Sequence, residues 1–207
     1  MSTTKKFVAV TTFIAVIAVL LFSSTIRTQA GGLSPEETAG ILYMREEEKL
    51  AHDVYVNLYK KWGLQIFQNI SQSEQNHMDA VKTLIDRYGL QDPASRKIGV
   101  FTNPHLQALY NELIARGELS LAEALKVGGA IEEIDILDLR TYLSQTDKSD
   151  IQQVYNHLLN GSYNHLRAFV STLSAKVGET YQPQYLDAED YQAIISAGNQ
   201  RGCKCQR

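Results

Sequence analysis

Four long helical patterns, each carrying ionisable residues on its apolar face, constrain this chain more than any other feature. Apolar side chains recur at helical spacing over about 35–62, 67–88, 120–145 and 149–176. Ser34 and Ser120 each precede a glutamate by three residues, which is typical of a helix start. Typical helix ends follow at Gly63, Gly89 and Gly178. No stretch alternates convincingly as a strand would, so the sequence predicts an all-α fold.

The connection between the second and third long helices indicates how the helices are arranged. Residues 90–103 have the composition of a loop, and a short helix is expected over 104–116. Another short helix is expected over 187–196, after Pro183. Two helical hairpins joined by a long connection are typical of a four-helix bundle with a crossover. The sequence therefore predicts one domain over 31–198, a four-helix bundle whose long crossover contains a short helix, with a short C-terminal helix.

Every apolar stripe holds a polar residue that could ionise or bind a cation. At about 100° per residue, the residues that fall on the stripes are Glu48 and His52, Glu74 and His77, Glu132 and Asp135, and His165 with Ser162. A buried charge without a partner costs several kcal/mol, so four such helices need compensation. A hydrogen-bonded polar network and a metal centre are the two forms of compensation open to them.

Residue type and spacing favour the metal centre. Glu74 and His77 are three residues apart, so both side chains point to one spot on one helix face. Inward Glu-x-x-His pairs and single glutamates from neighbouring helices bind two iron or manganese ions in carboxylate bundle proteins. Glu48 and Glu132 supply the single glutamates, and His165 supplies a second imidazole. We expect these five residues to bind metal, most readily iron, with manganese as the alternative.

The fourth helix departs from this ligand pattern. A second Glu-x-x-His pair is expected there, but the chain has Ser162 three residues before His165. Asp135, one turn from Glu132, could replace the missing carboxylate from the neighbouring helix, or it could lie at a solvated edge. With Asp135 the set again holds four carboxylates and two histidines. Without it, the expectation is a single ion, a lopsided pair or no metal.

Other residues near these ligands have weaker signals. His52 could be a ligand, a hydrogen-bond partner of a ligand or a polar edge residue, and we favour the second role. Tyr55 faces the core and could donate to a ligand carboxylate, although an ordinary core tyrosine is commoner. Gly128-Gly129 indicates close helix approach or space for a small oxidant beside Glu132. The residues expected to face solvent are Glu46, Glu47, Lys49, Glu133, Asp138 and His157.

Short segments around these residues resemble known helical proteins. In 48–55, Ala51 and Tyr55 follow Glu48 as in the first helix of rubrerythrin, a member of the ferritin-like superfamily. Segments 73–77 and 129–133 are similar to its second and third helices. The whole of 34–198 resembles an uncharacterised prokaryotic ferritin-like family, the domain of unknown function 2202. The segments that carry this second resemblance are 45–51, 73–78, 131–136 and 164–169.

The resemblance implies a ferritin-like fold and a function. Ferritin-like proteins of this kind hold a non-haem dinuclear centre that handles iron, dioxygen or peroxide, which implies a peroxidase-like or ferroxidase-like oxidoreductase. Rubrerythrins usually transfer electrons with a Cys-rich rubredoxin module, which this sequence does not contain. The missing carboxylate of the fourth helix favours two alternatives: a protein that stores metal without turnover, and a metal-free helical binding protein.

The first thirty residues are typical of an export signal. Lys5 and Lys6 precede the apolar run 7–22, and Thr28-Gln29-Ala30 has the small-x-small pattern of a cleavage site. The run is short for a membrane span, so we favour cleavage after Ala30 over an uncleaved anchor. The domain is therefore expected to be secreted or periplasmic, in contact with a membrane only if residues 1–30 are retained.

The remaining features bear on partners. A polar tail over 199–207 contains both cysteines, Cys203 and Cys205, which suit a soft cation, an intermolecular disulfide or no role at all. The formal net charge of −3 at pH 7 argues against a nucleic-acid partner. Metal ions and a small oxidant, dioxygen or peroxide, are the expected partners, and the sequence leaves the oligomeric state open.

Overall fold

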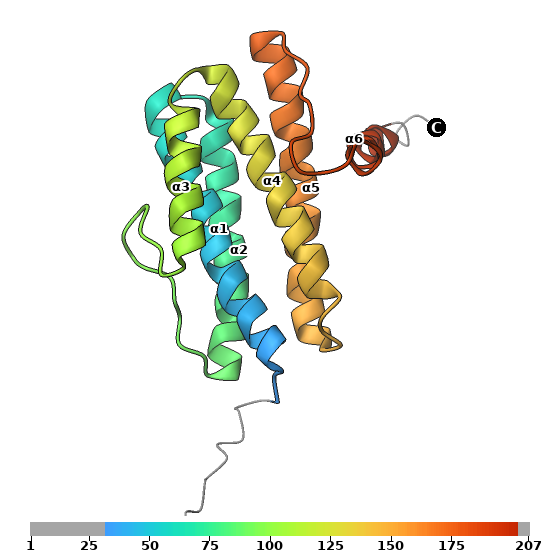
Figure 1. Cartoon of the computed structure of the whole chain (residues 1–207). Helices are drawn as coiled ribbons and strands as arrows, with labels where there is room; N and C mark the ends of the chain where they lie inside the picture. The colour runs from blue at the N-terminus through green and yellow to red at the C-terminus, as the bar shows by residue number, and fades with distance from the viewer. Residues whose placement is uncertain (1–31, 203–207) are drawn as a thin grey trace, which may run out of the picture.

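The computed structural model describes residues 32–202, and within that range the chain forms six helices and no strands, which confirms the all-α prediction (Figure 1). The helices are α1 (Pro35–Trp62), α2 (Gln65–Tyr88), α3 (Pro104–Gly117), α4 (Leu121–Leu143), α5 (Ser149–Val177) and α6 (Ala188–Gly202). The expected export signal, Cys203 and Cys205 lie outside the described residues.

Side-chain caps determine where the long helices begin. The Ser34 hydroxyl accepts a hydrogen bond from Glu37 N at 3.1 Å, and Glu37 Oε2 accepts one from Ser34 N at 2.8 Å, so the first predicted capping box forms. Ser120 caps α4 by accepting from Glu123 N at 3.1 Å. The Glu123 side chain does not complete this second box, because its carboxylate pairs with Arg116 Nε at 2.7 Å.

Three predicted helix ends are off by a few residues. α2 begins at Gln65 rather than near residue 67, and α4 ends at Leu143 rather than near residue 145. α6 continues to Gly202, beyond the expected end at residue 196. Fraying makes the terminal residues of a helix the least determined part of it, so these differences leave the order and pairing of the helices unchanged.

The helices pack as two antiparallel hairpins. α1 lies along α2 and α4 lies along α5, and the hairpins meet through α1 with α4 and α2 with α5 (Figure 1). α3, within the crossover, packs against α1 and α4, and α6 runs across α5 (Figure 1). This is the predicted bundle with a crossover. Among the described helices, none is both long enough and apolar enough to cross a membrane.

The two consecutive glycines of α4 make room for aromatic rings. A Cβ at Gly128 would lie 2.5 Å from the Phe169 ring, and a Cβ at Gly129 would lie 2.5 Å from the Tyr181 ring. Phe169 also packs against Tyr55, with ring centroids 5.2 Å apart. The glycines therefore serve ring packing from α5 and the segment after it, which leaves no space there for a small oxidant.

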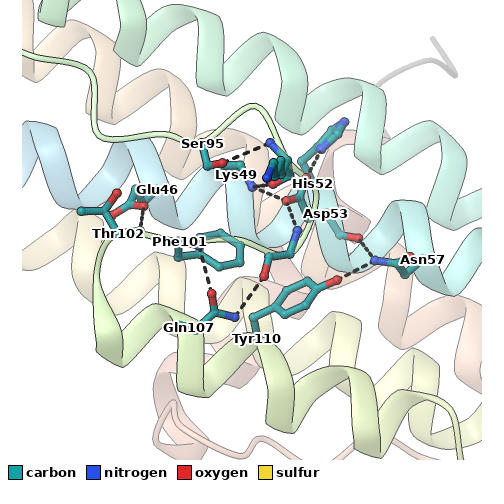
Figure 2. Close-up of polar contacts among 12 residues, drawn as sticks. Glu46, Lys49, His52, Asp53, Asn57, Ser95, Phe101, Thr102, Gln107 and Tyr110 are labelled. Atoms are coloured by element: carbon teal, nitrogen blue, oxygen red, sulfur yellow. Dashed lines mark hydrogen bonds and ion pairs between the residues drawn. The ribbon is translucent and has the colours of Figure 1, made fainter.

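A buried polar network attaches the crossover to α1 (Figure 2). Glu46 accepts from the backbone N–H groups of Thr102 at 2.6 Å and Asn103 at 2.9 Å. The Lys49 ammonium pairs with Asp53 and donates to the Lys97 carbonyl at 3.0 Å. The prediction that Glu46 and Lys49 face solvent is wrong, because both bind chain segments that cover α1.

Glu133 plays the same part in the second hairpin. Its carboxylate is fully buried and accepts from the Tyr181 hydroxyl at 2.7 Å. It also accepts from three consecutive backbone N–H groups, those of Gln184, Tyr185 and Leu186, at 2.6–2.9 Å. The prediction that Glu133 is exposed is wrong, since its hydrogen bonds hold the segment between α5 and α6 against α4.

Candidate metal centre

Side chains from all four long helices converge in the middle of the bundle. They are Glu48 from α1, Glu74 and His77 from α2, Glu132 from α4 and His165 from α5. None is more than 9% exposed. The structure thus brings together the five residues that helical spacing had placed on separate stripes.

Glu74 lies at the centre of this cluster. Its Oε2 lies 2.7 Å from His77 Nδ1, and its Oε1 lies 2.8 Å from His165 Nδ1. Glu48 Oε2 lies 3.2 Å from the same His77 nitrogen, and Glu132 Oε2 lies 3.4 Å from the same His165 nitrogen. Two triads therefore share Glu74, and within each triad the candidate ligand atoms lie within 4.8 Å of one another.

The donor set fits a pair of divalent cations. Each triad offers one imidazole nitrogen and two carboxylates, a mixture that suits iron or manganese. His165 Nδ1 and Glu74 Oε1 are only 2.8 Å apart, yet neither has a partner with hydrogen-bond geometry. Glu48 Oε1 also has none. Buried polar atoms without hydrogen bonds are rare in proteins, and here all three belong to residues of the two triads, where a bound cation would satisfy them.

Ion pairing in the cluster shifts the pKa values of its members. Burial alone would lower the pKa of His77, but Glu48 and Glu74 outweigh burial and raise it to about 11. Burial would likewise lower the pKa of His165, which Glu132 and Glu74 raise to about 10. Both imidazoles therefore carry a proton at neutral pH in the absence of a bound cation.

Burial and the neighbouring histidines shift the pKa values of the three carboxylates by different amounts. Burial would raise the pKa of Glu74, but its two histidine partners prevail and lower it to about 2. Burial raises the pKa of Glu48 to about 7, with His77 acting against the rise. Burial also raises the pKa of Glu132, partly opposed by His165. Glu74 therefore stays ionised throughout the physiological range.

Neighbouring groups hold the candidate ligands in place. The Tyr55 hydroxyl donates to Glu132 Oε1 at 2.5 Å, the contact with a ligand carboxylate that the sequence allowed for. His165 Nε2 lies 3.0 Å from the Ser73 hydroxyl. A Cβ at residue 161 would lie 2.5 Å from His77 Cε1, so Gly161 makes room for that ring. Ser73 and Gly161 give no signal in the sequence, because neither lies on an apolar stripe.

Asp135 and Ser162 bind each other beside the cluster. Both are buried, and the Ser162 hydroxyl donates to Asp135 Oδ2 and to the Leu158 carbonyl. Asp135 Oδ1 has no hydrogen-bond partner, and Asp135 belongs to neither triad. Of the two expectations for Asp135, the solvated edge is wrong.

His52 lies apart from the cluster. Its side chain is 21% exposed, and its Nδ1 pairs with Asp53 Oδ1 at 2.9 Å, within the network that attaches the crossover. His157 is exposed, as expected, although its ring lies edge-on to His77 with centroids 5.6 Å apart.

Comparison with known proteins identifies the family. The family model described as "Uncharacterized protein domain (DUF2202)" matches residues 37–198. The "Uncharacterized protein MJ0754" of Methanocaldococcus jannaschii is 52% identical over 171 residues, which is 82% of this chain and 92% of that protein. The crystal structure of hypothetical protein MJ0754 from Methanococcus jannaschii DSM 2661 has the same fold, with a TM-score of 0.77 at 52% identity, and covers 79% of this chain and 94% of that one. The chain belongs to the DUF2202 family, as its motifs indicated.

Proposed function

We propose that this chain is a ferritin-like metalloprotein that binds two divalent cations, iron or manganese, in the middle of its bundle. Glu48, Glu74 and His77 would hold one cation, and Glu74, Glu132 and His165 the other. The observation that carries the proposal is the Glu74 carboxylate, whose two oxygens each lie within 2.8 Å of a different histidine Nδ1. A carboxylate shared in this way by two nitrogen-containing triads is typical of dinuclear centres in bundle proteins.

The surrounding side chains prepare the ligand atoms. The Ser73 hydroxyl is placed to accept a hydrogen bond from His165 Nε2–H, which would leave Nδ1 free for a cation. Tyr55 donates to one oxygen of Glu132 and leaves the other directed at His165. Each histidine must give up a proton before its nitrogen can bind a cation, so binding is coupled to proton release.

The resemblance to rubrerythrin suggests which chemistry the centre performs. A pair of iron ions, once bound, supplies electrons to dioxygen or peroxide. The chain supplies a dry enclosure for that chemistry, since none of the five ligand residues is more than 9% exposed. We therefore propose an oxidoreductase of the peroxidase or ferroxidase type.

Metal content tests the cation site directly. The mature chain, purified without metal-affinity steps and analysed by mass spectrometry, should contain about two iron or manganese ions per chain. Glu74→Ala, which removes a ligand from both triads, should abolish stoichiometric metal, and His77→Ala, which removes a ligand from one triad, should lower it to about one ion. His105→Ala, which replaces an exposed histidine on α3, should leave metal content unchanged. Unchanged metal content in both Glu74→Ala and His77→Ala would overturn the proposal.

One observation favours a second candidate, a metal-free binding protein. Both histidines have carboxylate partners within 2.8 Å, so protonated imidazoles compensate the buried acids without a cation. This candidate predicts that a chelator leaves the melting temperature unchanged. Metal storage without turnover shares the site of the first proposal. It predicts bound iron together with no oxidase or peroxidase activity.

We also propose that the domain functions outside the cytoplasm, in keeping with the export-signal pattern of residues 1–30. Expression in a bacterial host with an intact export pathway should yield a chain that begins after Ala30. The mass of the intact protein from the periplasmic fraction would establish this. A full-length chain confined to the cytoplasm would contradict it.

A further inference from the structure

A line of acids leads along α4 away from the candidate centre. Glu132, Asp135 and Asp138 are spaced by three residues, which corresponds to about 4.5 Å of rise per step. Glu132 and Asp135 are buried, and Asp138 is half-buried. Asp138 also lines a surface pocket of about 450 Å³ together with Tyr43 of α1 and Glu112 of α3. The line thus begins in the centre and ends in a pocket open to solvent.

Glu47 of α1 lies beside this line, near Asp135 and Asp138. It is 3% exposed, and neither of its carboxylate oxygens has a hydrogen-bond partner among the described residues. Burial raises its pKa well above the usual value, and repulsion from Asp135 and Asp138 adds to the rise, which places both acids close by. The prediction that Glu47 faces solvent is wrong, and an unpartnered buried carboxylate in a native fold needs a reason.

Two other buried glutamates differ from Glu47 in that their carboxylates accept backbone hydrogen bonds. Glu46 accepts two backbone hydrogen bonds and Glu133 accepts three, so both stabilise the folded chain. Glu47 accepts none, and it lies one helical turn after Tyr43, which lines the surface pocket. Asp135 Oδ1 is a second buried oxygen without a partner. Both acids thus keep oxygens available between the pocket and the centre.

We propose that Asp138, Glu47 and Asp135 form a route by which divalent cations pass from the surface pocket to the centre. This inference rests on the proposed function. Carboxylate oxygens without hydrogen-bond donors can replace the water ligands of a cation one after another along such a route. Within the described chain, only the two triads of the centre bring three ligating groups within 4.8 Å. The acids of the route do not form a third such group, so they pass cations on and do not retain them.

Rapid mixing of the metal-free chain with cobalt(II), a spectroscopic stand-in for ferrous iron, tests the route. The rate at which the absorption of bound cobalt appears reports loading, and mass spectrometry after desalting reports the final stoichiometry. Glu47→Gln and Asp138→Asn should each slow loading about tenfold at unchanged stoichiometry, because each removes a carboxylate that can bind the passing cation. Asp79→Asn, which removes an exposed acid of α2, is the control and should load at the wild-type rate.

The outcomes separate the route from the site that it serves. Wild-type loading rates in both Glu47→Gln and Asp138→Asn, with full stoichiometry, would overturn the route and leave the centre intact. A lower final stoichiometry in Glu47→Gln would make Glu47 a ligand, which also overturns the route. A wild-type chain that binds no cobalt at all would overturn the proposed function, and the route with it. Asp138 is half-buried, so the loading rate of Asp138→Asn tests the route even if Glu47→Gln fails to fold.

Discussion

The two hairpins of the bundle supply the same kind of site with different residues. α1 and α4 each contribute one glutamate, Glu48 and Glu132. α2 adds Glu74 three residues before its histidine, whereas α5 has Ser162 at that position. The difference is offset one helix away, because α4 has Asp135 three residues after its glutamate, where α1 has Ala51. In the second hairpin the acid has moved from one helix to its neighbour, and Ser162 donates a hydrogen bond to it.

This exchange makes the centre asymmetric. Glu74 faces both histidines, while Asp135 faces Ser162 and belongs to neither triad. Seven residues after Glu48 stands Tyr55, which donates to Glu132. Seven residues after Glu132 stands Leu139, which has no donor to offer. Glu48 Oε1 accordingly has no hydrogen-bond partner. The first hairpin therefore supplies the shared ligand, and the second supplies the single glutamate that accepts a hydrogen bond from a tyrosine.

Because of this asymmetry, substitution of the shared ligand should remove more metal than any other single change. Glu74→Gln should reduce bound metal from two ions to none, because it removes a ligand from both triads. Glu48→Gln should remove one ion, because Glu48 belongs to one triad. Asp135→Asn should keep both. Mass spectrometry of the reconstituted variants measures all three. Loss of metal in Asp135→Asn would make Asp135 a ligand and restore the symmetry that the structure lacks.

A second prediction concerns how metal affinity depends on pH. Both hairpins should contribute equally to this dependence, since each contributes one histidine. The pKa values of His77 and His165, about 11 and about 10, keep both protonated at neutral pH without a cation. The apparent affinity should therefore rise with pH between 6 and 8, by about tenfold per pH unit for each proton displaced. Calorimetry in buffers of different ionisation enthalpy counts those protons. Glu48→Gln, which retains one triad, should release about half as many, and pH-independent binding would contradict the assignment.

The features of the two hairpins that depend on helical periodicity could be predicted from the sequence. An apolar stripe locates a core face, and a three-residue spacing places Glu74 and His77 on one spot of it. Helical periodicity alone therefore predicts the five candidate ligands. Whether they bind metal stays a prediction.

The sequence could not predict which neighbouring acids are buried. Glu46 and Glu133 bind backbone amides more than fifty residues away in the chain. Those amides lie in irregular segments, whose sequences show no helical or strand periodicity. Glu47 gives no local signal either, because its neighbours in space, Asp135 and Asp138, belong to another helix. Whether an acid next to a ligand in the sequence is buried or exposed can therefore be decided only from the tertiary structure.

A third prediction uses the packing around the two glutamates. Four residues before Glu132 stands Gly128, under the ring of Phe169. The corresponding residues of the first hairpin are Met44 and Val81, so there the larger side chain is on the other helix. Gly128→Ala should lower the free energy of unfolding by about 1–3 kcal/mol, because the ring has to move. Thermal denaturation followed by circular dichroism measures this. An unchanged melting temperature would mean that the ring has free space beside it.

The smallest expected effect concerns Glu47, whose counterpart in the second hairpin is Ile131. Glu47→Gln should raise the free energy of unfolding of the metal-free chain by about 1 kcal/mol, because it removes a buried acid without a hydrogen-bond partner. The folded chain raises the pKa of Glu47, so the native acid costs more stability as pH rises above 4.5, its ordinary value. The gain should therefore be larger at pH 8 than at pH 5. Glu133→Gln is the matched control and should destabilise the chain, since it weakens hydrogen bonds to three backbone amides. Destabilisation by Glu47→Gln at both pH values would show that Glu47 supports the fold, and the difference between the hairpins at this position would then be structural.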